Sequence, residues 1–202
     1  MLAYFVLRQR EPTSSMTINV INMSTSVHSA SSDVRPGDSV IDRIVDANRR
    51  YAADFKDPGL EGRPKLKVAV VACMDTRLDL PAALGLEVGD AHTMRNAGGV
   101  ITDDMIRSLS ISQRELGTRS VVLVHHTRCG MQTISEHFRD ALEDEVGQRP
   151  MWAVESFKDA EQDVRQSMQR VRTSPFIPHT DDVRGFVLDV NTGLLHEVGA
   201  DF

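Results

Sequence analysis

Two short, almost wholly apolar runs constrain this chain more than any other feature: residues 67–72 (KVAVVA) and residues 120–125 (SVVLVH). Such runs are typical of strands that are covered on both faces, as in the parallel sheets of α/β proteins. Residues 91–95 read as a weaker strand, and residues 184–190 and 194–198 flank an Asn-Thr-Gly turn, which predicts a hairpin. We therefore expect an α/β fold, a mainly parallel β-sheet with an antiparallel edge strand, flanked by helices.

Three stretches have the apolar spacing of helices that pack one face against a neighbour. Residues 40–55 have it most clearly, with Val, Ile, Tyr and Phe at intervals of three and four. A second helix is expected from Thr102, a capping residue followed by two aspartates, to residue 116. In the third stretch, Ser156 followed three residues later by Asp159 resembles a capping box.

Length and composition predict one folded domain and argue against several classes of partner. The chain has 202 residues, enough for a single domain over residues 36–202, whereas residues 1–35, rich in Ser, Thr and Asn, are predicted to be a disordered tail. The net charge of -6 and the lack of a basic stripe argue against nucleic acid. No run reaches the roughly 20 apolar residues of a membrane span, so we expect a cytoplasmic protein without a membrane partner.

The two cysteines of the chain lie where α/β proteins place functional groups. Cys73 directly follows one predicted strand, and His126 and Cys129 follow another in the pattern H-x-x-C. If the two strands are neighbours, the three side chains converge at the carboxyl edge of the sheet. Thiolate and imidazole together suit zinc, and three protein ligands leave a position open for catalysis.

Each of these residues, taken singly, also has a purely structural explanation. A lone buried cysteine is usually a small hydrophobic residue, and a histidine after a strand is usually structural. His125 is an alternative ligand to His126, although it does not fit H-x-x-C. Met74 and Met131, next to the predicted ligands, are expected to pack the core rather than to touch a cofactor.

The run from Cys73 to Arg77 adds a possible catalytic pair. Asp75 and Arg77 are two residues apart, close enough for the guanidinium to hold the carboxylate with two hydrogen bonds. The alternative is that Asp75 caps the following helix while Arg77 is simply exposed.

Three motifs in order resemble the β-class carbonic anhydrases: C-x-D-x-R at Cys73, then the segment 95–98 (Arg-Asn-Ala-Gly), then H-x-x-C-Gly at His126. The resemblance covers residues 40–198. It implies that Cys73, His126 and Cys129 bind Zn2+ and that Asp75 and Arg77 form a catalytic dyad. The backbone N–H of Gly130 would bind substrate, and the enzyme would hydrate carbon dioxide to bicarbonate. It also implies a homodimer or dimer-based oligomer, in which the helix at residues 40–55 lies against the second subunit.

Departures from the family pattern leave two alternatives open. Thr76 stands where many members have Ser, and we identify no Gln or aromatic side chains of a substrate pocket. Hydrolysis of carbonyl sulfide or carbon disulfide at the same site is one alternative. The other is a non-catalytic zinc-binding regulatory module with Asp75 as a permanent fourth ligand.

The pair Gly98-Gly99 lacks a phosphate-loop pattern and is expected to form a tight turn.

Overall fold

The computed structural model describes residues 39–56 and 58–199, and these fall into two units that divide after Phe55. The first unit contains helix α1 (Val40–Ala53), whose N-cap is Ser39, and the second contains all other elements. The predicted tail at residues 1–35 lies outside the described residues. The prediction of a single domain over residues 36–202 stays a prediction.

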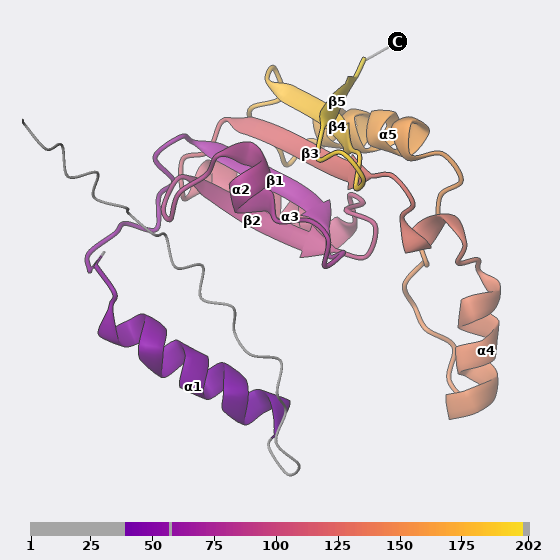
Figure 1. Cartoon of the computed structure of the whole chain (residues 1–202). Coiled ribbons are helices and arrows are strands. Elements are labelled where there is room, and N and C mark those ends of the chain that lie inside the picture. The colour runs from indigo at the N-terminus through magenta and orange to yellow at the C-terminus, as the bar shows by residue number, and fades with distance from the viewer. Residues whose placement is uncertain (1–38, 57, 200–202) are drawn as a thin grey trace, which may run out of the picture. The chain divides into compact units, whose positions relative to one another are not determined.

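The second unit is built on one five-stranded sheet (Figure 1). Its strands have the order β2-β1-β3-β4-β5, where the first four are parallel and β5 is antiparallel to β4. Their bounds are β1 Val68–Cys73, β2 Ala91–Asn96, β3 Ser120–His126, β4 Val183–Leu188 and β5 Leu195–Val198. The predicted fold class is confirmed, including the hairpin at the antiparallel edge.

Helices cover both faces of this sheet. Val164 and Met168 of α5 (Ala160–Thr173) pack in the same apolar cluster as Leu109 of α3 (Asp103–Arg114). Leu80 of the short helix α2 (Leu80–Leu84) belongs to the cluster on the other face. The connection from β1 therefore crosses one face and the connection from β3 crosses the opposite face, which makes the gap between β1 and β3 the switch point of the sheet.

Two details of the helices differ from the sequence prediction. Ser156 does not cap α5; the carboxylate of Asp159 accepts hydrogen bonds from the backbone N–H groups of Glu161 and Gln162, at 2.8 and 3.0 Å, because the helix begins only at Ala160. Helix α4 (His137–Val146) was not predicted, since none of its residues is buried and its apolar pattern is weak. None of the helices that the structure describes has both the length and the apolarity that a bilayer crossing requires.

Candidate metal centre and catalytic dyad

The switch point places the three predicted ligands at one edge of the sheet. Cys73 is the last residue of β1 and His126 is the last residue of β3, and these two strands are parallel neighbours. Cys129 follows three residues later, at the N-cap of the short 3₁₀ helix η1 (Gly130–Gln132). The ligand groups of side chains 56 residues apart in sequence thus meet because the two strands end side by side.

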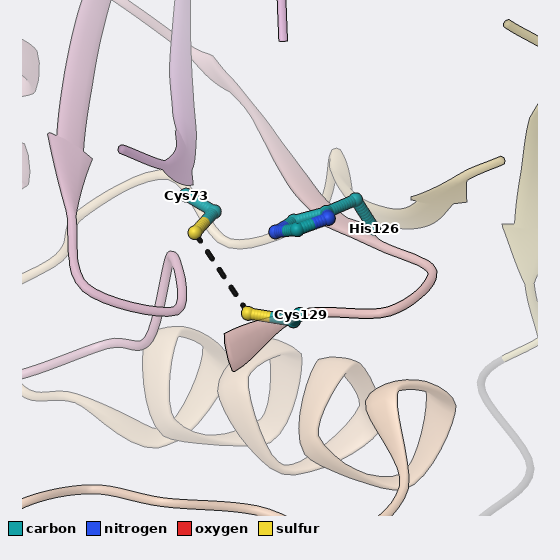
Figure 2. A group of neighbouring side chains, drawn as sticks. All are labelled: Cys73, His126 and Cys129. Carbon is teal, nitrogen blue, oxygen red and sulfur yellow. Dashed lines mark hydrogen bonds between the residues drawn. The ribbon is translucent and has the colours of Figure 1, made fainter. Parts of the chain in front are cut away.

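The three side chains form a compact and buried cluster (Figure 2). One ligand atom from each of Cys73, His126 and Cys129 lies within 4.8 Å of the others. The two Sγ atoms are 3.9 Å apart, and both cysteines are free thiols. Two sulfurs and one imidazole nitrogen at this separation are a suitable donor set for a single ion that prefers soft or borderline ligands.

The hydrogen bonds of His126 leave one ring nitrogen free for a metal. Its Nδ1 atom lies 3.0 Å from the backbone oxygen of Thr127, and this contact requires a proton on Nδ1. The other nitrogen, Nε2, is buried and has no hydrogen-bond partner in the described structure. A buried acceptor without a partner is costly. The residues present therefore fit a metal ion, which would take up this lone pair.

The two thiols of the cluster have opposite pKa shifts in the metal-free pair. The hydrogen bond from Cys129 lowers the pKa of Cys73 to about 4, against a smaller opposing effect of burial. The same hydrogen bond, together with burial, raises the pKa of Cys129 well above its ordinary value. The shared hydrogen bond and the short distance thus favour a thiolate on Cys73 next to a thiol on Cys129.

Asp75 and Arg77 form the two-pronged pair that their spacing predicts. The Nε and Nη2 atoms of Arg77 donate to Oδ1 and Oδ2 of Asp75 at 2.8 and 2.7 Å, and the backbone N–H of Arg77 donates to Oδ1 at 3.0 Å. These bonds lower the pKa of Asp75 well below its ordinary range. The Oδ2 atom also lies 3.7 Å from Nε2 of His126. An ionised carboxylate is thus fixed at the edge of the cluster.

The neighbours of these residues account for two further sequence expectations. His125 points away from the cluster, since adjacent residues of a strand face opposite sides, and its Nε2 lies 2.7 Å from Asp163 of α5. Met131 is buried as expected, but Met74 is 63% exposed, so the expectation that Met74 packs the core is wrong. Met74 follows the end of β1, where the chain has already left the covered part of the sheet.

The end of β2 and the turn after it contact the loop that carries the dyad. Gly98 and Gly99 both have positive φ and make the expected tight turn. A Cβ atom on Gly99 would lie 2.7 Å from the backbone nitrogen of Cys73, so the turn approaches the end of β1 too closely for any side chain. Arg95 donates to three backbone oxygens of the same loop. In the sequence, Arg95 stood out only as the first residue of the motif at residues 95–98 and by its place at a predicted strand end, and neither feature indicated this role.

An apolar cavity of about 400 Å³ lies next to the cluster. Its lining includes Met74 and Met131, each within two residues of a candidate ligand. It also includes Phe138 and Trp152, whose ring centroids are 6.4 Å apart. The sequence did not predict this pair of aromatic side chains, because they come from an unpredicted helix and from the loop after it.

A mainly parallel α/β sheet with a buried Cys-His-Cys cluster and a carboxylate at its switch point has the donor set of a metalloenzyme. A family model described as "Carbonic anhydrase" matches residues 68–195. The chain is 52% identical over 161 residues to "Beta-carbonic anhydrase 1" of Mycobacterium tuberculosis, an alignment that covers 79% of this chain and 98% of that protein. The chain therefore belongs to the carbonic anhydrase family, within its β class.

Two further relatives bear on the fold and on the substrate. The crystal structure of carbonic anhydrase from Streptococcus mutans has a TM-score of 0.75 and 41% identity, and the match covers 80% of this chain and 99% of that one. A carbon disulfide hydrolase of Acidithiobacillus thiooxidans is 34% identical over 148 residues, which are 62% of this chain and 74% of that protein.

Proposed function

We propose that this enzyme catalyses the reversible hydration of carbon dioxide to bicarbonate and a proton, with zinc held by Cys73, His126 and Cys129. The observation that carries the proposal is the buried Nε2 of His126, which has no partner in the described structure and faces two thiols. Zinc, when bound, supplies the nucleophile by lowering the pKa of a water molecule toward about 7.

Asp75 is proposed to be the catalytic acceptor of a hydrogen bond from the attacking oxygen. Its carboxylate stays ionised because Arg77 donates two hydrogen bonds to it, so it accepts and does not donate at neutral pH. The hydrogen of the nucleophile therefore points toward Asp75. A lone pair of the same oxygen is left to face the carbon of the substrate. Arg77 holds the carboxylate in place and also donates to the backbone oxygen of Arg128 at 3.1 Å, which ties the dyad to the loop of Cys129.

The surroundings suit a small, uncharged and apolar substrate. The cavity beside the cluster is lined by Met131, Phe138 and Val154, and it needs no charged group to admit carbon dioxide. The backbone N–H of Gly130, at the start of η1, is proposed to bind the oxygen on which negative charge develops as bicarbonate forms.

Hydrolysis of carbon disulfide or carbonyl sulfide is the second candidate, favoured by the relative that is named a carbon disulfide hydrolase. All three substrates are linear and apolar, so an apolar cavity does not separate them. The relative named a β-carbonic anhydrase is more similar, and the match to it covers more of both proteins. A regulatory module with Asp75 as a fourth ligand is less well supported, since Arg77 already holds both oxygens of Asp75.

Assembly and location belong to the same proposal. Helix α1 has no buried residue, and its apolar side chains Val40, Ile41 and Ile44 are all at least 60% exposed. An apolar face of this kind is unusual for a helix that stays uncovered. We propose a homodimer or dimer-based oligomer in which a second copy covers this face.

A cytoplasmic location is proposed because a reducing compartment keeps Cys73 and Cys129 available as thiolates.

Stopped-flow assays with carbon dioxide, carbonyl sulfide and carbon disulfide, made on one preparation of known zinc content, test the substrate directly. We expect the value of kcat/KM for carbon dioxide to exceed the other two by at least about 100-fold, a transition-state preference of roughly 3 kcal/mol. A higher kcat/KM for either sulfur compound would assign the chain to the second candidate.

A further inference from the structure

We propose that Arg95 is a positioning residue that holds the loop between Cys73 and Leu78, and with it the Asp75–Arg77 dyad, in its working geometry. The inference rests on the proposed function, since it assumes that the dyad acts in catalysis. Arg95 itself is not assigned any contact with substrate or metal.

The contacts of the Arg95 guanidinium point to this role. Its Nε, Nη1 and Nη2 atoms donate to the backbone oxygens of Cys73, Leu78 and Asp75, at 2.9, 3.2 and 2.7 Å. The three acceptors belong to one turn of the chain, which leaves β1, carries the dyad and leads to α2. A planar guanidinium has donors in fixed directions, so one side chain can fix three carbonyl groups relative to one another.

The backbone around Arg95 makes it a firm support. Arg95 lies in β2, which is paired with β1 up to Asn96, opposite Cys73. The N–H of Met74 extends this pairing by donating to the backbone oxygen of Asn96 at 2.8 Å. The backbone of Arg95 therefore belongs to the paired part of the sheet, and its side chain reaches the less regular loop. Its hydrogen bonds restrict the motion of the loop that carries the dyad.

The exposure of Arg95 separates positioning from general stability. Arg95 is an exposed residue, and hydrogen bonds at an exposed site contribute little to the free energy of unfolding. Geometry at the reacting atoms is far more demanding, because a displacement of about 1 Å can cost about 100-fold in rate. Replacement of Arg95 is thus expected to harm turnover much more than folding.

The experiment compares Arg95→Met, Arg95→Lys and the control Arg107→Met in the full-length, zinc-loaded enzyme. Arg107 is also exposed, and among the residues that the structure describes its side chain donates to Asp104, which is neither a candidate ligand nor part of the dyad. We expect Arg95→Met to keep about one zinc per chain and to lose about 10- to 100-fold in kcat. Arg95→Lys keeps the charge but not the planar guanidinium with its several donors, and its kcat should lie between those of Arg95→Met and the wild type. The kcat of Arg107→Met should match the wild type.

A double-mutant cycle with Asp75→Asn distinguishes action through the dyad from any other effect. If Arg95 acts through Asp75, adding Arg95→Met to Asp75→Asn should lower kcat by less than about 3-fold further. In the zinc-loaded protein, Arg95→Met should also speed hydrogen exchange of the amides of Arg77 and Leu78, a readout that does not depend on activity.

Independent, multiplying losses of kcat, full activity of Arg95→Met, or loss of its zinc would each overturn the proposal. Should Arg95→Met fail to fold, the same cycle is run with Arg95→Lys, and wild-type kcat in Arg95→Lys would overturn the role of the fork. If the zinc-loaded wild type does not hydrate carbon dioxide, the proposed function is what fails, and if Asp75→Asn alone keeps full activity, the proposed role of the dyad fails. If Asp75→Asn is impaired and Arg95→Met is not, only the role of Arg95 fails.

Discussion

Among single residues, Asp75 is the one proposed to have an acid–base role, and its side chain is held by Arg77 rather than by the candidate ligands. In Asp75→Asn the amide accepts a hydrogen bond less strongly and has no charge for Arg77 to hold. We expect kcat to fall by about 100-fold or more while zinc content is kept. Stopped-flow kinetics at alkaline pH with metal analysis check this, and near-normal turnover would contradict the dyad role.

Protonation of Asp75 gives a second test at this scale. The hydrogen bonds from Arg77 lower its pKa in the folded state, so the stabilisation from this pair is present above the unfolded pKa of about 3.9 and is lost as pH falls through the lower folded value. In Arg77→Gln the pKa of Asp75 should rise toward its ordinary value. A ¹³C NMR titration of the carboxyl group, assigned with Asp75→Asn, measures this. An unchanged pKa in Arg77→Gln would contradict Arg77 as its main cause.

The strands were the most predictable elements, and the site they position followed from them. The uninterrupted apolar runs of β1 and β3 mark strands buried on both faces, and both strands end on a candidate ligand. The short helix α2 and the wholly unburied α4 have no comparable pattern, so the aromatic wall that α4 helps to form was not predictable. Nor was the left-handed conformation of Arg128, with a φ of 56°, which turns its backbone oxygen toward Arg77.

The turn between β2 and α3 makes a prediction at the scale of elements. A Cβ atom on Gly99 would meet the backbone of β1 and would also require a strained positive φ. We expect Gly99→Ala to lower the free energy of unfolding by about 2–4 kcal/mol through strain and overpacking. Gly117→Ala is the matched control: its φ is also positive but nothing lies near its Cβ position, so about 1–2 kcal/mol is expected. Equal losses in urea denaturation would mean that the close approach to β1 is unimportant.

The apolar face of α1 raises the question of assembly at the scale of the whole molecule. We expect light scattering at micromolar concentration to give at least twice the 22.4 kDa mass of one chain. The double change Ile41→Glu and Ile44→Glu should produce monomers, because it places charges on the face proposed to be covered. Arg49→Glu with Arg50→Glu is the control, because with 3.6 residues per turn both residues point away from the face of Val40, Ile41 and Ile44, and it should leave the mass unchanged. A monomeric wild type would refute the proposed dimer.

Zinc-dependent hydration of carbon dioxide is tested by following the metal content and the activity of the same samples. Protein purified without chelators is assayed by stopped flow before zinc removal, after removal and after zinc is returned, with metal content measured on each sample. We expect about one zinc per chain, loss of hydration with the metal, and recovery on its return, whereas Cys129→Ala should neither hold zinc nor recover. Protein that contains no zinc, or that hydrates carbon dioxide equally well without it, would contradict the claim.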